Sequence, residues 1–348
     1  MTTHGDDRIL DAANILATQP LYILSTAGQE LFHTNMLFWL AARYPEESAS
    51  VFERLGIAIS EAPKNYEKVS REHKNIDLIV EYGADSLLVI ENKIAAIATQ
   101  RQLDAYEEKF VGKRVKFALL SLMPVMSPPP PWQEVGYQDL IDPLRHTSNA
   151  IRASFDSQLV EAYQQLVVTL VALCSAVAPQ SSDEIWSLKK ETREELSRIR
   201  VLPLVEKMRG NLIASHVLGA TSLAASAGLS NSLGLVEYFS GPIKGTRGHR
   251  RGWQMQGDQF RLAVSTGKAK KYSGEKKCEV RERLVESLYL EHFDFDALSS
   301  GKSILLQDKS TKGWLGYNPN FVYRYRPISH AASWSQIKVL CVEATLRT

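Results

Sequence analysis

Three residues in the first third of the chain have side chains that can act together on a phosphate ester. Asp77 lies in the apolar segment 76–82, and Glu91 and Lys93 follow the apolar run 87–90. Residues two apart in a β-strand point to the same face, so Glu91 and Lys93 would share one face. Two carboxylates can hold Mg²⁺, which polarises phosphate and acidifies bound water, and an ammonium can offset transition-state charge. We therefore expect Asp77, Glu91 and Lys93 to be catalytic, with both carboxylates as metal ligands.

The spacing Glu-x-Lys carries little weight without its context. The same spacing occurs at residues 72–74, 107–109 and 275–277, all within polar sequence. Only the triplet at 91–93 ends an apolar run, as expected of a strand that delivers polar groups to one edge of a sheet. The alternative interpretation is a surface salt bridge between Glu91 and Lys93.

The segments around these residues must form elements that bring them together. Segments 76–82 and 87–94 have the apolar, β-branched composition of strands, and the turn-forming residues 83–86 between them predict an antiparallel hairpin. This hairpin would place Asp77 and Glu91 at similar depth on neighbouring strands. We further expect strands at 67–72, 115–122 and 132–137, and helices at 29–44 and 99–110. This order predicts an α/β fold, in which helices flank a mixed sheet.

The remaining chain has a different composition. A long helix is expected over residues 154–177, and the break at 178–182 is the best candidate for a linker. Residues 184–228 have helical composition, whereas glycines, aromatic residues and basic residues alternate from residue 235 onward, which predicts β-structure. We therefore expect an N-terminal α/β domain at 1–178, a helical connector at 179–234 and a β-rich basic C-terminal region at 235–348.

Positive charge is concentrated in the C-terminal region. Residues 242–283 contain twelve Lys or Arg and four Asp or Glu, a net charge of +8, whereas the whole chain carries only +2, so the rest carries −6. Such asymmetry is typical of a phosphate-binding surface, and nearby aromatic residues can stack on bases. Solvated loops and a surface for an acidic protein partner are the alternatives. The residues expected to contact nucleic acid are Arg250, Arg251, Lys270 and Lys271.

Composition argues against several other classes of protein. Hydrophobic residues make up 44% and charged residues 23%, which is ordinary for a soluble globular protein. The longest apolar run, 166–178, is shorter than the roughly 20 residues that span a bilayer, and no secretory signal is visible at the start. The three cysteines lie far apart, so neither a structural zinc site nor a disulfide framework is expected. We expect a cytoplasmic location and no membrane partner.

Over about residues 25–145, these features resemble the PD-(D/E)xK nuclease superfamily. Ile76-Asp77 stands where the family has Pro-Asp, and Glu91-Asn92-Lys93 supplies the E-x-K motif. Glu30 lies in the preceding helix, where many members carry an acidic residue that contributes to the metal site. Gln102-Leu-Asp-Ala-Tyr106 is similar to the Q-x-x-x-Y motif of the RecB-type branch. The resemblance implies a restriction-endonuclease-like fold.

The same resemblance implies roles for residues outside the E-x-K motif. Glu30 would be a catalytic residue and a metal ligand, and Gln102 and Tyr106 would line the substrate cleft. His33 shares a helix face with Glu30 and would contact phosphate or support Glu30. Simpler interpretations exist: Glu30 and His33 could lie on a partly exposed helix edge, and Tyr106 could belong to the core.

Together these features predict a Mg²⁺-dependent deoxyribonuclease, with Mn²⁺ as a substitute ion. The resemblance to stand-alone bacterial members implies a role in restriction or phage defence, with DNA favoured over RNA as the partner. A homo-oligomer or a defence-system partner is compatible with the sequence. Two alternatives stay open: a nucleic-acid-binding module that does little chemistry, and a subunit of a larger complex with an interaction scaffold in its C-terminal half.

Overall fold

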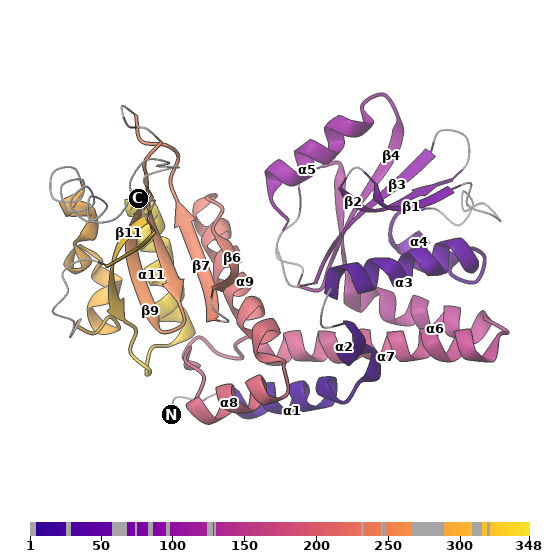
Figure 1. Ribbon diagram of the computed structural model, residues 1–348, viewed down its shortest axis with the longest axis horizontal. Coiled ribbons are helices and arrows are strands. Elements are labelled where there is room, and N and C mark those ends of the chain that lie inside the picture. The colour runs from indigo at the N-terminus through magenta and orange to yellow at the C-terminus, as the bar shows by residue number, and fades with distance from the viewer. Residues whose placement is uncertain are drawn as a thin grey trace. The chain divides into compact units, whose positions relative to one another are not determined.

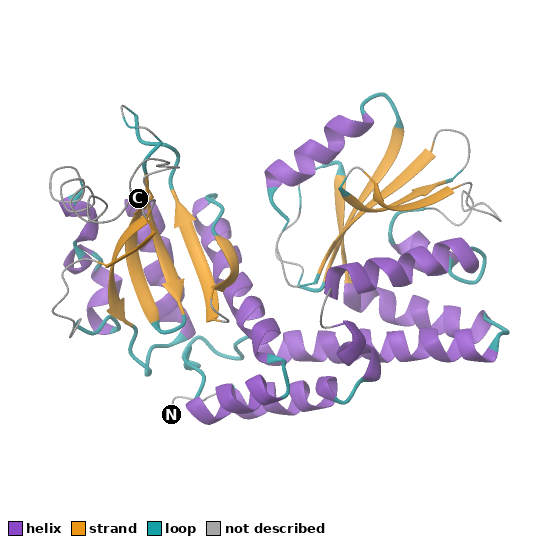
Figure 2. Ribbon diagram, viewed as in Figure 1, coloured by secondary structure: helices purple, strands orange, loops and turns teal. Residues whose placement is uncertain are grey.

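The structure is a computed structural model in which the chain divides into two compact units. The N-terminal unit comprises Asp7–Val177 and Arg198–Val201, and the C-terminal unit comprises Met1–Asp6, Ala178–Ser197 and Leu202–Thr348. Each unit is described by itself below (Figures 1 and 2). The residues that the structure describes are 5–25, 29–57, 68–73, 75–82, 86–94, 98–123, 128, 130–230, 233–244, 246, 248–265, 289–307, 315–318 and 321–348.

The N-terminal unit contains a five-stranded mixed sheet and its flanking helices. The strands are β1 (Lys68–His73), β2 (Ile76–Glu81), β3 (Ser86–Lys93), β4 (Arg114–Ser121) and β5 (Trp132–Gly136). Its helices are α1 (Asp6–Ala17), α2 (Pro20–Ser25), α3 (Gln29–Arg43), α4 (Ala49–Arg54), α5 (Gln100–Glu107), α6 (Ile141–Ala150) and α7 (Ser154–Val177), with 3-10 turns η1 (Glu108–Phe110) and η2 (Tyr137–Leu140). The sheet order is β1-β2-β3-β4-β5, antiparallel from β1 to β3 and parallel from β3 to β5.

The central strand β3 is buried along its whole length. Helices α3 and α5 lie on opposite faces of the sheet (Figure 1). Val89 of β3 packs in one apolar cluster with Leu103 and Tyr106 of α5, which accounts for the apolar composition of this strand. A parallel pair of strands needs a crossover connection, and α5 provides it between β3 and β4.

The register of β2 and β3 brings two acidic positions level with one another. Leu78 pairs with Ile90 and Ile79 with Val89 in an antiparallel ladder. Continuing that ladder by one position places Asp77 opposite Glu91. Directly opposed residues of an antiparallel pair project to the same face, so the two carboxylates project together toward the α5 side of the sheet.

The C-terminal unit is built on a six-stranded antiparallel sheet. The sheet order is β10-β11-β9-β8-β7-β6. Its strands are β6 (Ser226–Ser230), β7 (Leu233–Phe239), β8 (Arg250–Gln256), β9 (Gln259–Ser265), β10 (Leu315–Asn318) and β11 (Phe321–Pro327). Its helices are α8 (Lys190–Arg198), α9 (Leu202–Thr221) and α11 (Trp334–Arg347), with 3-10 turns η3 (Leu290–Phe293), η4 (Phe295–Ala297) and η5 (Ser299–Ser303).

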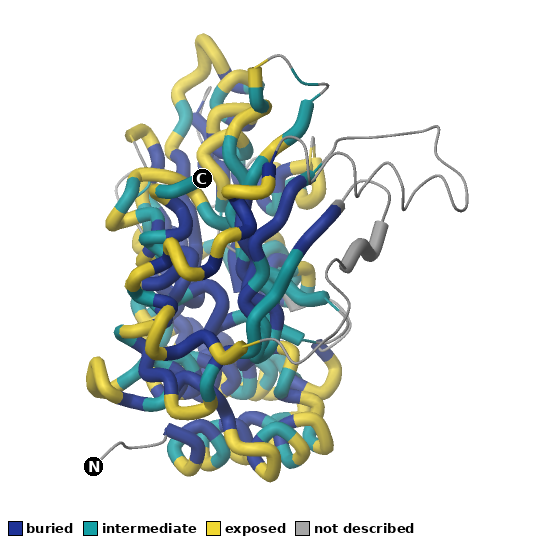
Figure 3. The backbone as a smooth tube through the Cα atoms, turned by 90° about the vertical axis from the view of Figure 1, so that its left-hand side faces the viewer, coloured by how far each residue is buried: buried dark blue, intermediate teal, exposed yellow. Residues whose placement is uncertain are grey.

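Helices α9 and α11 pack on the sheet of the C-terminal unit. Trp253 of β8 is fully buried, and its indole N–H donates to Thr345 of α11 at 2.8 Å. Strand β8 is buried over residues 252–256, whereas the edge strand β6 has no buried residue, and buried and exposed positions alternate along the helices (Figure 3). The helical stretch expected up to residue 228 ends earlier, at Thr221, because residues 226–230 pair with β7 as an edge strand. The expected mixed α/β fold with a β-rich C-terminal region is otherwise confirmed.

Helix α7 has the bounds expected from the sequence. Among the described residues, it is the one helix long and apolar enough to cross a membrane. Its apolar residues Val160, Leu166 and Leu173 are fully buried, and it packs against α6 and α2. A helix enclosed in this way serves as the core helix of a globular unit.

Candidate active site

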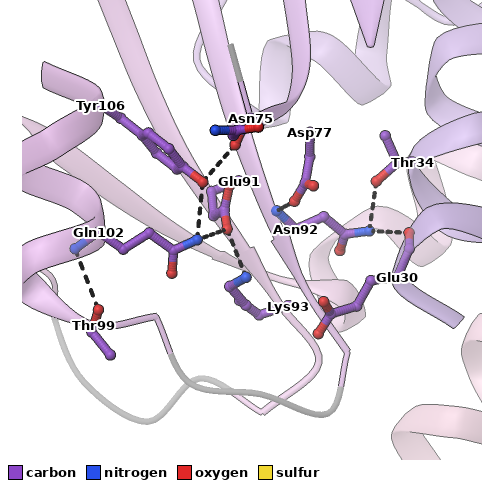
Figure 4. Close-up of polar contacts among 10 residues, drawn as sticks. All are labelled: Glu30, Thr34, Asn75, Asp77, Glu91, Asn92, Lys93, Thr99, Gln102 and Tyr106. Atoms are coloured by element: carbon purple, nitrogen blue, oxygen red, sulfur yellow. Dashed lines mark hydrogen bonds and ion pairs between the residues drawn. The ribbon is translucent and has the colours of Figure 1, made fainter. Parts of the chain in front are cut away.

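Glu91 and Lys93 form a buried ion pair at the end of β3. The Lys93 Nζ lies 2.6 Å from Glu91 Oε1, and the side chains of Lys93 and Glu91 are 11% and 2% exposed respectively. Their alternation along the strand gives them a common face, as the sequence predicted. The pair is therefore no surface salt bridge, and its burial makes its electrostatics strong (Figure 4).

Asp77 lies beside this pair on β2. It is half-buried, and its Oδ2 accepts a hydrogen bond of 2.8 Å from the backbone N–H of Asn92. Burial raises the pKa of Asp77, while that hydrogen bond and the charge of Lys93 oppose the rise. The structure thus brings Asp77, Glu91 and Lys93 together from neighbouring strands.

Glu91 is the most perturbed carboxyl group of the site. Burial raises the pKa of Glu91 to about 7, against the lowering effect of Lys93 and with a further rise from Asp77 and Glu30. Its Oε2 is buried and has no hydrogen-bond partner among the residues that the structure describes. A buried carboxylate oxygen without a partner is costly, and this atom is therefore available to a further group at the site.

Lys93 keeps its charge in this environment. Burial alone would lower the pKa of Lys93, but Glu91, Glu30 and Asp77 together hold it above the ordinary value. A cation is therefore present at the site at neutral pH.

Glu30 reaches the same site from the first turn of α3. It is half-buried, and its charge raises the pKa of Asp77, Glu91 and Lys93 alike. Figure 4 draws it in one group with these three side chains. Its placement agrees with the expected contribution to a metal site, and that role stays a prediction.

Gln102 and Tyr106 approach Glu91 from α5. Thr99 caps this helix by accepting from the Gln102 backbone N–H, which fixes the first turn. The Gln102 Nε2 donates to Glu91 Oε1 at 2.6 Å and to the Tyr106 hydroxyl at 3.0 Å, and that hydroxyl donates to the Asn75 carbonyl at 2.6 Å. Gln102 thus contacts the site directly, whereas the buried Tyr106 holds the Gln102 side chain through its hydroxyl.

The family comparison agrees with this geometry. Residues 20–129 match the family model described as the PD-(D/E)XK nuclease superfamily. The superfamily expected from the sequence is confirmed for this segment. The match contains Glu30, Asp77, Glu91, Lys93 and Gln102, and supports a nuclease-type fold for residues 20–129. No curated protein and no solved structure matches the chain.

PD-(D/E)XK nucleases generally use divalent metals, so the fit of these residues to such an ion bears on their role. No group of three or more His, Cys, Asp or Glu within the described ranges is placed to hold a metal ion. The free Glu91 Oε2 and the neighbouring Asp77 carboxylate nevertheless supply the hard oxygen donors that Mg²⁺ prefers. Since Mg²⁺ is often held by one or two carboxylates and keeps several waters, this sparse donor set fits it.

His33 lies elsewhere in the PD-(D/E)XK segment. It is 1% exposed, and its Nδ1 lies 3.0 Å from the Tyr163 hydroxyl of α7. Burial lowers the pKa of His33 to about 3, so the ring is neutral. It shares its helix face with the fully buried Leu37 and Leu40. A buried neutral ring does not reach phosphate, so this placement argues against the expected substrate contact.

Asn92, the middle residue of the E-x-K motif, has a place in the site that its sequence position did not predict. It projects from the opposite face of β3 and is 1% exposed. Its Nδ2 donates to the Glu30 carbonyl at 3.0 Å and to Thr34 Oγ1 at 3.2 Å, and its Oδ1 accepts from the Tyr137 hydroxyl at 2.8 Å. A polar side chain within a fully buried strand needs hydrogen-bond partners. The position of Asn92 in an apolar strand was therefore the feature of the sequence that could have indicated these contacts.

The basic residues expected to contact nucleic acid belong to the C-terminal unit. Arg250 is exposed at the start of β8, and the adjacent Arg251 is half-buried. Lys270 and Lys271 lie outside the described residues. Their role stays a prediction.

Proposed function

We propose that this protein is a metal-dependent nuclease that hydrolyses phosphodiester bonds, with DNA as its substrate and Mg²⁺ as its ion. The observation that carries the proposal is the convergence of Asp77, Glu91 and Lys93 in a segment that matches the PD-(D/E)XK superfamily. A surface salt bridge would not be buried, and water would hydrate the carboxylate oxygen that the lysine does not engage.

Each residue has a distinct part in the proposed reaction. Asp77 and Glu91 would hold the ion, and Glu30 would orient its waters from α3. The bound ion would polarise the scissile phosphate and acidify a water. Lys93 stays protonated and offsets negative charge that develops on the phosphate.

Gln102 and Lys93 both engage Glu91 Oε1, which leaves Oε2 of the same carboxylate for the ion. This division of the two oxygens preorganises the ligand, because the carboxylate cannot rotate without breaking both interactions.

The C-terminal unit would hold the nucleic acid. Its segment 242–283 carries a net charge of +8, which suits a phosphate backbone. We further propose that the protein acts in the cytoplasm in restriction or phage defence, that Mn²⁺ can replace Mg²⁺, and that assembly occurs as a homo-oligomer or with a defence-system partner.

One assay tests the proposal directly. Purified protein is incubated with end-labelled linear DNA, circular DNA and RNA in Mg²⁺, Mn²⁺ or EDTA, beside Asp77→Asn as a matched control. Cleavage that needs the ion and Asp77 supports the proposal, and the substrate panel identifies the nucleic acid. Tight binding of the same DNA without cleavage would instead favour the nucleic-acid-binding module.

A further inference from the structure

We propose that Asn92 is a positioning residue, whose side-chain amide fixes the first turn of α3 and so sets Glu30 against Asp77 and Glu91. The inference rests on the proposed function, because it concerns the geometry of the same carboxylates. It assigns a role to the middle position of the Glu91-Asn92-Lys93 triplet, on the face of β3 that the reaction does not use.

The hydrogen-bonding capacity of the Asn92 amide is almost fully used. Both N–H groups point to α3, one to the Glu30 carbonyl and one to Thr34 Oγ1. Residues four apart lie one above the other on a helix, so these two hydrogen bonds hold one face of its first turn. Figure 4 shows the amide directed at this turn.

Asn92 connects to Asp77 through its own backbone. Its N–H donates to Asp77 Oδ2 at 2.8 Å, while its side chain crosses to α3. Asn92 also stands between Glu91 and Lys93 in β3. The backbone of Asn92 therefore holds Asp77, and its side chain holds the first turn of α3, so Asn92→Ala removes only the contacts with α3.

A buried hydrogen-bonded chain holds the Asn92 amide from behind. The Tyr137 hydroxyl donates to Asn92 Oδ1 at 2.8 Å, and Tyr137 is hydrogen-bonded to Tyr163. The Tyr163 hydroxyl lies 3.0 Å from Nδ1 of His33. Asn92, Tyr137, Tyr163 and His33 are all buried, and satisfied buried networks rigidify the elements that they join.

This hydrogen-bond network contacts α3 at both of its ends. Asn92 binds Thr34 at one end, and His33 at the other end is the residue next to Thr34. Helix α3 is thus held at two neighbouring positions by strand β3 and helix α7. This arrangement gives His33 a supporting place in the network, in agreement with its burial.

The test is a calorimetric titration of the purified full chain with Mn²⁺, without nucleic acid. Asn92→Ala should weaken Mn²⁺ binding about 10- to 100-fold, as is usual when the support of a metal ligand is removed. Tyr137→Phe removes one hydroxyl, with its hydrogen bonds to Asn92 and Tyr163, at almost unchanged volume. It leaves the contacts of the Asn92 amide with α3 in place, so it should weaken binding by a smaller factor. It also serves as the second variant if Asn92→Ala does not fold.

A double-mutant cycle identifies the residue through which Asn92 acts. If Asn92 acts through Glu30, then Asn92→Ala should weaken Mn²⁺ binding far less in a Glu30→Gln background than in wild type. Ser148→Ala provides the matched control, because it removes the partly buried hydrogen bond from the Ser148 hydroxyl to the Ser157 carbonyl in the same unit. Its Mn²⁺ affinity should equal that of wild type at a comparable decrease in thermal stability.

Two results would overturn the inference. The first is that Asn92→Ala and Tyr137→Phe both fold and both bind Mn²⁺ with wild-type affinity. The second is that Asn92→Ala weakens Mn²⁺ binding as much in the Glu30→Gln background as in wild type. If the wild-type protein binds no Mn²⁺, the proposed function fails, and the inference that rests on it fails too. If the wild-type protein binds Mn²⁺ and the variants bind it equally well, only the inference fails.

Discussion

Gln102 donates a hydrogen bond of 2.6 Å to Glu91 Oε1, the same oxygen that lies 2.6 Å from Lys93 Nζ. Both donors therefore engage one oxygen of the carboxylate, and its other oxygen is buried with no hydrogen-bond partner in the described part of the chain. The crossover helix α5 thus orients a strand residue that lies next to it in space.

We expect Gln102→Leu to reduce kcat/KM for cleavage about 10- to 100-fold, because Glu91 loses a donor that orients it. Gln100→Leu is the matched control, since Gln100 is exposed on the same helix and bonds Asp104 instead. Equal rates for Gln102→Leu and wild type, measured with saturating Mg²⁺, would show that Lys93 alone orients the carboxylate.

Lys93→Ala should lower kcat by about 10²–10³, because the site loses its positive charge. Metal binding should persist, since neither carboxylate is changed. Removing one partner of a buried ion pair also costs about 3–5 kcal/mol of folding free energy, so the metal-free variant should unfold earlier on heating. Lys116→Ala, an exposed lysine on β4, is the control. Unchanged kcat in Lys93→Ala would remove this residue from the reaction.

Asp77→Asn and Glu91→Gln should each abolish cleavage while the fold survives, because each loses a charged metal ligand at little change in volume. Single-turnover assays with Mg²⁺ measure the decrease, and circular dichroism verifies the fold. Turnover close to wild type in either variant would contradict the assignment.

Glu91 should make the metal-free protein less stable as pH rises. Its folded pKa of about 7 lies above its ordinary value of 4.5, so the folded state holds the proton more tightly than the unfolded state. The favourable contribution is complete below about pH 4.5 and is lost as pH rises through 7, by up to about 3 kcal/mol. Glu91→Gln should largely flatten this dependence in EDTA, whereas the exposed Glu53→Gln should not. Urea unfolding at pH 5 and pH 8 measures the difference, and equal slopes for Glu91→Gln and wild type would contradict it.

DNA binding should weaken and become less dependent on salt when four residues are replaced by Ala: Arg250, Arg251, Lys270 and Lys271. The slope of the log binding constant against the log salt concentration should become shallower by about one for each phosphate that is no longer neutralised. Fluorescence anisotropy across a salt titration measures both quantities, and Mn²⁺ affinity should stay unchanged. The exposed Arg145→Ala of α6 is the control for charge alone. An unaltered slope in the fourfold variant would favour the alternative of solvated loops.

Local patterns predicted the elements that carry the site. The apolar segments of β2 and β3, the turn between them and the polar end of β3 all appear in continuous sequence, so their pairing followed from composition and period. For Gln102, the signal was the resemblance of residues 102–106 to the Q-x-x-x-Y motif, which implied a place in the substrate cleft. The structure places Gln102 in contact with Glu91.

Interactions between distant segments were beyond such patterns. Asn92 meets Tyr137 across 45 positions, and His33 meets Tyr163 across 130 positions. His33 shares its helix with Glu30, and the sequence does not show that one side chain turns toward the site while the other enters the core. His33 enters the core because its neutral ring has a hydrogen-bond partner there, the Tyr163 hydroxyl, which lowers the cost of burying it.

The chain from Asn92 to His33 has a consequence for kinetic experiments. Burial lowers the pKa of His33 to about 3 and raises the pKa of Tyr137 and Tyr163 above their ordinary values, so none of these groups changes charge between pH 5 and pH 9. Asn92 does not ionise at all. The net charge of these four residues therefore stays the same over this pH range. They should contribute no inflection of their own to a pH–rate profile.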